Sequence, residues 1–139
     1  YTVPIGPAKV SRTGGDVSLF AYGLMHHLSL QAAEKASQQG VSVEVVDLRT
    51  LYPVDRQTIL ESVKKTGKAL IVHEDNLTGG YGAEIAATIA EGAFEYLDAP
   101  VRRLAGPDVP GVPFSHPLQE WFMPDAEKIH QAIMDLAAW

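Results

Sequence analysis

One polar, glycine-rich stretch, HEDNLTGGYGAE over residues 73–84, carries the residue types most able to do chemistry. His73, Glu74 and Asp75 follow an apolar run, KALIV, that is typical of a buried strand. Open α/β sheets bind ligands at the carboxyl ends of their strands, so this cluster is a candidate site. Neighbouring residues on a strand face opposite ways, so only some of these side chains can converge on one point. A structural or interface hydrogen-bonding role is therefore favoured over a catalytic one.

The glycines Gly79, Gly80 and Gly82 lead from this cluster into an alanine-rich helix. A phosphate site here would need backbone N–H groups converging at the helix N-terminus. The loop matches neither G-x-G-x-x-G nor G-x-x-x-x-G-K-[ST], and no lysine is nearby. Glu84, in the first turn, would repel an anion. We therefore expect the small residues to let the helix approach the sheet, or a second subunit, closely.

Composition excludes several other kinds of site. The chain has no cysteine, which removes disulfides, thiolate metal ligands and cysteine nucleophiles. No serine lies in a G-x-S-x-G elbow, and His26 and His27 are adjacent, so on a helix they point about 100° apart. The net charge of −6 with scattered Lys and Arg argues against nucleic acid. No apolar run long enough for a membrane span and no signal peptide is visible, so we expect an intracellular protein.

The elements that must position the cluster alternate between strand and helix patterns. A hairpin is expected around 13–16, followed by strands at 17–22, 41–48, 68–74 and 101–104 and by helices at 24–39, 55–66 and 80–97, with an irregular loop at 106–117 and a last helix after Asp125. This order predicts an α/β fold, a mainly parallel sheet between helix layers. The hairpin would add one antiparallel strand to it.

The first eight residues, YTVPIGPA, combine two prolines and a glycine and lack an initiator methionine. We expect residues 1–8 to be the remnant of an interdomain linker and residues 9–139 to form one domain. The aromatic residues Trp121, Phe122 and Trp139 near the end of the chain fit core closure and a partner interface equally well.

The motifs VDLRTLYPVD, SVKKTGKALIVHE and GAEIAATIAE, the last followed by LDAP, occur in combination and in order. With flanking segments they cover nearly the whole chain, which resembles the C-terminal, transketolase-like domain of the beta subunit of thiamine-dependent 2-oxo-acid dehydrogenases. The resemblance implies a three-layer α/β/α fold with a five-stranded, mostly parallel mixed sheet. It also implies an assembly and partner-docking domain, inactive alone, with no catalytic, cofactor-binding or metal-binding residue. Thiamine diphosphate and Mg²⁺ would sit between an alpha subunit and another part of the beta subunit.

The same resemblance implies the partners: an alpha subunit, a second beta subunit and a lipoyl acyltransferase core. Asp98 in LDAP and the carboxylate of Trp139 are the residues it suggests for docking the acyltransferase. The stretch HEDNLTGG is closer to the branched-chain type than to the pyruvate type. The expected location is the cytoplasm, or the mitochondrial matrix in a eukaryote. Two alternatives stay open: the equivalent domain of a transketolase or deoxyxylulose-phosphate synthase, and a freestanding flavodoxin-like nucleotide-binding module.

Overall fold

The computed structural model describes all residues, 1–139. The strands are β1 (Lys9–Arg12), β2 (Val17–Ala21), β3 (Val43–Asp47), β4 (Ala69–Asn76) and β5 (Arg102–Gly106). The helices are α1 (Leu24–Ser37), α2 (Arg56–Thr66), α3 (Gly82–Ala93), α4 (His116–Phe122) and α5 (Ala126–Ala137), with a 3₁₀ turn, η1 (Phe94–Tyr96), after α3. Each predicted strand and helix is present, with boundaries that differ by a few residues.

The five strands form one mixed sheet in the order β1-β3-β2-β4-β5. Strands β3, β2, β4 and β5 are parallel, and only β1 runs antiparallel, at one edge. The predicted fold class is therefore confirmed. The predicted hairpin is wrong, because β1 pairs with β3, with Lys9 opposite Asp47, and does not pair with β2.

The turn that suggested a hairpin instead crosses the start of β3. Asp16 donates its backbone N–H to the Ser42 carbonyl at 2.8 Å, and its carboxylate accepts the Ser42 N–H at 2.7 Å. Gly14 lies so close to this strand that a Cβ there would stand 2.2 Å from the Val43 backbone. The turn is thus bound to the start of β3. In a hairpin β1 would be the neighbour of β2, but here β3 lies between them.

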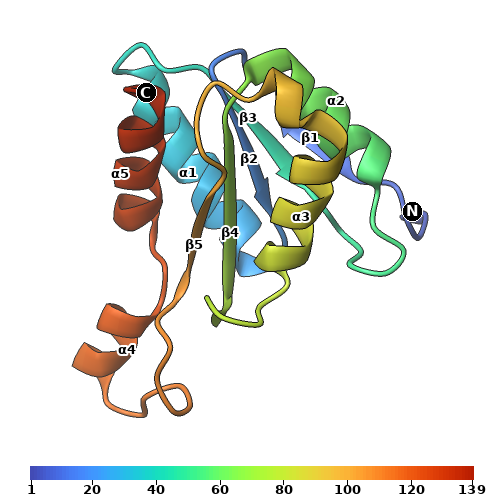
Figure 1. Cartoon of the computed structure of the whole chain (residues 1–139). Coiled ribbons are helices and arrows are strands. Elements are labelled where there is room, and N and C mark those ends of the chain that lie inside the picture. The colour runs from blue at the N-terminus through green and yellow to red at the C-terminus, as the bar shows by residue number, and fades with distance from the viewer.

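Alternation along the strands divides the core between the two faces of the sheet (Figure 1). Helices α1 and α5 cover one face, where Leu19 and Val45 meet Ile133 of α5. Helices α2 and α3 cover the other face, where Phe20 and Ile71 are buried. Strand β2 is buried along its whole length, because it has parallel neighbours on both edges and helices on both faces.

Helix α2 begins and ends as its sequence predicts. The Asp55 carboxylate accepts the backbone N–H of Thr58 at 3.0 Å, which caps the helix, and Gly67 ends it in the left-handed conformation at φ 71°. Asp55 also accepts the N–H of Ala8 at 2.9 Å. Burial raises the pKa of Asp55, but these hydrogen bonds outweigh it and leave that pKa below its ordinary value. The same carboxylate therefore joins Ala8 to the start of α2.

Two predictions about the later chain need correction. The helix expected over 80–97 is shorter: α3 ends at Ala93 and passes into η1. Residues 106–117 were expected to be wholly irregular, yet α4 begins at His116 with Pro117 in its first turn, where a proline is tolerated. Phe122 is buried and its ring lies where a Cβ on Gly106 would meet it, at 2.6 Å, so this aromatic residue closes the core. Helix α4 projects from the body of the fold (Figure 1).

No helix is both long enough and apolar enough to cross a lipid bilayer.

Candidate functional site

His73 lies inside the domain and not on its surface. It belongs to β4, its exposure is 0%, and neither ring nitrogen has a hydrogen-bond partner. The ring stacks against Tyr22 with centroids 6.4 Å apart. Burial lowers the pKa of His73, Asp75 opposes this shift and Arg103 adds to it, so the imidazole is neutral near pH 7. An interface role for this ring, one of the sequence-based interpretations, does not fit its complete burial.

The glycines at the start of α3 form a cradle for the His73 ring. A Cβ on Gly80 would stand 2.6 Å from His73 Cε1, and a Cβ on Gly82 would stand 2.4 Å from His73 Nε2. Gly79 faces open space but has φ 77°, a conformation that suits glycine. Further along, a Cβ on Gly92 would approach Leu60 of α2 to 2.7 Å. Gly80, Gly82 and Gly92 therefore allow close packing within the domain, whereas Gly79 serves the backbone conformation of the loop.

Because His73 is buried and neutral, the free energy of unfolding should depend on pH. Its pKa in the fold lies below the ordinary 6.5, so the unfolded chain binds more protons below about pH 6.5 and acid favours unfolding. Burial also lowers the pKa of His26, which acts in the same direction although Asp47 opposes it. We expect stability to be full above pH 6.5 and to fall below it, by up to about 1.4 kcal/mol per pH unit for each group.

Urea unfolding between pH 5.5 and 8 measures this dependence. His73→Gln should reduce the change of the unfolding free energy with pH, whereas His116→Gln, at an exposed position on α4, should leave that change as it is. An unchanged slope in the His73 variant would show that this histidine does not carry the effect.

The acidic neighbours of His73 are exposed. Glu74 and Asp75 lie at the carboxyl end of β4 and face solvent. Burial is the main cause that raises the pKa of Tyr22, and the negative charges of Asp75 and Glu74 raise it further. The interface role of Glu74 stays a prediction, and the three side chains do not converge on one point, because His73 is buried while Glu74 and Asp75 are exposed. No group of three or more His, Cys, Asp or Glu side chains could hold a metal ion.

The two docking candidates, Asp98 and Trp139, lie at the opposite end of the sheet, where β4 and β5 begin. The Asp98 N–H donates to the Gly67 carbonyl at 2.8 Å, immediately before β4. Lys68, the next residue, donates from Nζ to the Ala137 carbonyl at 2.9 Å, two residues from the C-terminus. Both segments appear at one end of the fold in Figure 1. The structure therefore brings these residues to a common end.

Both candidates are exposed and held. A Cβ on Gly67 would stand 2.1 Å from Asp98 Oδ2, so the carboxylate lies directly against Gly67. Trp139 is 64% exposed, and Arg102 lies over its ring at 5.6 Å from the centroid. Phe94, which is 75% exposed, lines the same hollow as Asp98. This end thus combines aromatic surface with charges of both signs.

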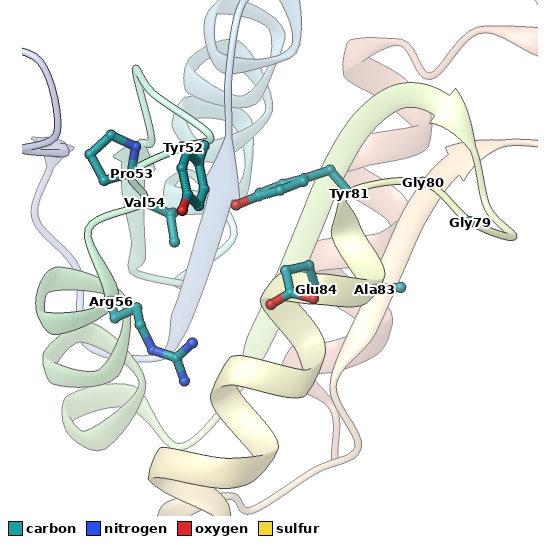
Figure 2. A pocket seen from close by; sticks show the side chains of 9 residues that line it. All are labelled: Tyr52, Pro53, Val54, Arg56, Gly79, Gly80, Tyr81, Ala83 and Glu84. Atoms are coloured by element: carbon teal, nitrogen blue, oxygen red, sulfur yellow. The ribbon is translucent and has the colours of Figure 1, made fainter.

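A groove of about 690 Å³ lies at the carboxyl edge of the sheet, between the β3–α2 connection and the start of α3. Its lining comprises Tyr52, Pro53, Val54, Arg56, Gly79, Gly80, Tyr81, Ala83 and Glu84 (Figure 2). Sequence reasoning examined the glycines and Glu84 but missed Tyr52, Arg56 and Tyr81. The sequence contains a signal for this groove. RTLYPVDRQ and the glycine-rich stretch each follow a central strand of a parallel sheet, so both lie at the carboxyl edge of that sheet.

The chain is a three-layer α/β domain built on a mixed sheet, in which Gly80, Gly82 and His73 pack against one another. The family model for the transketolase C-terminal domain matches residues 6–129. The chain belongs to the transketolase C-terminal domain family.

Relatives agree with this assignment. The chain is 46% identical over 137 residues to the 2-oxoisovalerate dehydrogenase subunit beta of Bacillus subtilis, and 44% identical over 132 residues to the pyruvate dehydrogenase E1 component subunit beta-2 of Oryza sativa. These matches cover 99% and 95% of this chain but only 42% and 35% of the relatives. A solved structure of a split gene transketolase, an inactive beta4 tetramer, superposes with a TM-score of 0.85 at 28% identity, over 99% of this chain and 43% of that one.

Proposed function

We propose that this chain is the C-terminal assembly and docking domain of the beta subunit of a 2-oxo-acid dehydrogenase that takes a branched-chain 2-oxo acid. The observation that carries the proposal is the 46% identity, over 99% of the chain, to the 2-oxoisovalerate dehydrogenase beta subunit. The whole enzyme would decarboxylate the 2-oxo acid and transfer the acyl group to a lipoyl group. It would act in the cytoplasm, or in the mitochondrial matrix of a eukaryote.

The residues of this chain do not fit thiamine diphosphate or Mg²⁺. No group of three or more His, Cys, Asp or Glu side chains could hold a metal ion. The His73 ring packs directly against Gly80 and Gly82 and occupies the space beside the glycine-rich loop. Glu84 adds a negative charge at the first turn of α3. The proposal therefore places the cofactor between the alpha subunit and another part of the beta subunit, and assigns no chemical step to this domain.

Exposed features at two places support contacts with other chains. Ala83, Ala87 and Ala90 are exposed and follow helical spacing, so the outer side of α3 lets another subunit approach closely. At the other end, the exposed carboxylate of Asp98 lines the same hollow as the exposed ring of Phe94. Aromatic residues are enriched at protein interfaces, whose rim is polar and solvent-accessible. We assign the first surface to the alpha or second beta subunit and the second to the lipoyl acyltransferase.

Titration of this chain onto a purified lipoyl acyltransferase core tests the docking role. We expect saturable binding that weakens as the salt concentration rises, because an oriented carboxylate facing a basic patch contributes a screened attraction. The chain should also compete with an assembled dehydrogenase for the same acyltransferase. Absence of both binding and competition at low salt would contradict the proposal.

A second candidate is the equivalent domain of a transketolase, favoured by the TM-score of 0.85 to the split gene transketolase. Sequence identity to that protein is only 28%, against 46% for the dehydrogenase subunit. The dehydrogenase is therefore the better supported of the two. Competition with an assembled dehydrogenase separates them, because a transketolase domain has no lipoyl partner to compete for.

A further inference from the structure

The groove between the β3–α2 connection and α3 shares Ala83 with the surface assigned above to another subunit, but the packing and docking roles do not explain its Tyr52, Arg56 and Tyr81. Its volume, about 690 Å³, is within the range of small-molecule sites. It opens beside the carboxyl ends of β3 and β4, the edge at which open α/β sheets bind ligands. Position and size together make it a candidate binding site.

Hydrogen bonds hold both walls of the groove in place. The Tyr81 hydroxyl donates to the Leu51 carbonyl, which joins the start of α3 to the β3–α2 connection. Within that connection, Thr50 Oγ1 donates to the Pro53 carbonyl at 2.9 Å. A site with such fixed walls is largely formed before a ligand arrives, so little ordering is needed on binding.

The lining combines apolar surface with one charge of each sign. Figure 2 shows the Tyr81 side chain reaching from the start of α3 toward Tyr52, with the side chains of Arg56 and Glu84 entering the gap between α2 and α3. Pro53 and Val54 add further apolar surface. Both charges act on Tyr81: burial first and then Glu84 raise its pKa, and Arg56 lowers it.

Arg56 and Glu84 differ in the partners that they already have within the fold. Arg56 Nη2 lies 3.4 Å from Glu91 Oε2, but both side chains are largely exposed, so this ion pair is weak. Its planar guanidinium keeps other N–H groups free for a carboxylate. Glu84 is exposed on the first turn of α3 and takes part in none of the ion pairs of the fold. A simple anion in the groove would be repelled by Glu84, and a simple cation by Arg56.

We propose that this groove binds a small zwitterion with an apolar body, of the class of α-amino acids with aliphatic side chains. The ligand carboxylate lies at Arg56, its ammonium group at Glu84, and its side chain between Tyr52 and Tyr81. This inference goes beyond the proposed function, which requires no ligand here. It stands or fails independently of the docking role.

Three probes with the same branched body but different charges test the assignment. L-Leucine carries both charges, 3-methylbutylamine only the ammonium group and 4-methylpentanoate only the carboxylate. Isothermal titration with the 139-residue chain should give a dissociation constant of about 1 mM or tighter for L-leucine. Each singly charged probe should bind at least about tenfold more weakly. No L-leucine binding, or equal binding of either singly charged probe, would overturn the proposal.

Matched variants locate the binding on the groove. Arg56→Gln and Glu84→Gln should each weaken L-leucine binding at least about tenfold. Glu61→Gln removes the same charge from an exposed position on α2 outside the groove and should leave binding unchanged. Circular dichroism checks that the variants are folded. Because both groove positions are exposed, folding should be preserved, and unchanged affinity in both groove variants would refute the site.

Discussion

Gly82→Ala should lower the free energy of unfolding by about 2–3 kcal/mol, although alanine is the better helix former. The new Cβ would stand 2.4 Å from His73 Nε2 and 2.7 Å from His73 Cδ2. The ring cannot yield easily, because it is fully buried, stacks on Tyr22 and also meets Gly80 along the same Nε2 edge. Either the start of α3 must move away from the sheet or the imidazole must leave its position.

Urea unfolding of the Gly82 variant at pH 7.5 measures the cost. Gly15→Ala is the matched control, since a Cβ there meets nothing within 4 Å and the residue has no positive φ. The control should be as stable as the parent or slightly more stable. In the double variant with His73→Ala, most of the cost of Gly82→Ala should disappear, because the colliding ring is gone. Equal stability of the Gly82 and Gly15 variants would show that the cradle is not tight.

Asp98→Lys should weaken binding to the lipoyl acyltransferase about 100-fold, equivalent to about 3 kcal/mol. The Asp98 carboxylate is exposed and lies against Gly67, and the backbone of Asp98 is held by the hydrogen bond from its N–H to the Gly67 carbonyl. A partner arranged to meet this negative charge would meet a positive one instead. Decarboxylation by the assembled dehydrogenase should stay unchanged, because the proposal assigns no chemical step to this domain.

Surface plasmon resonance at two salt concentrations measures the loss of affinity. Asp98→Asn keeps the shape and should cause a smaller loss, with a weaker dependence on salt. Glu120→Gln, on α4 at the far end of the fold, should bind as the parent does. An unchanged affinity in Asp98→Lys would remove this residue from the docking surface.

The features that the sequence predicts well are those decided by local chemistry. Asp55 is recognisable as the cap of α2 because its carboxylate serves an N–H only three residues away. The buried strands are recognisable because residues such as those of Val43–Asp47 are mainly β-branched. Once strands and helices alternate, the three-layer arrangement follows.

The features that the sequence does not predict depend on distant partners. The turn at 13–16 has the residues of a hairpin, and only the contacts with Ser42 show that β1 lies beside β3. The groove likewise depends on two connections that are distant in the sequence: the hydrogen bond that joins them links Tyr81 to Leu51, which are 30 residues apart. The complete burial of His73 is not predicted either, because it depends on Gly80 and Gly82, which pack on the ring from the next element and leave no periodic signal in the sequence. Such contacts are set by the packing of the whole domain.

The most direct test of the central claim, that this domain assembles an enzyme without doing its chemistry, is an assay of the isolated chain. Release of carbon dioxide from 3-methyl-2-oxobutanoate would be followed with thiamine diphosphate and Mg²⁺ added and no other subunit present. We expect the rate to equal that of the cofactor and metal alone. A rate above that background, lost when the chain is unfolded, would contradict the claim.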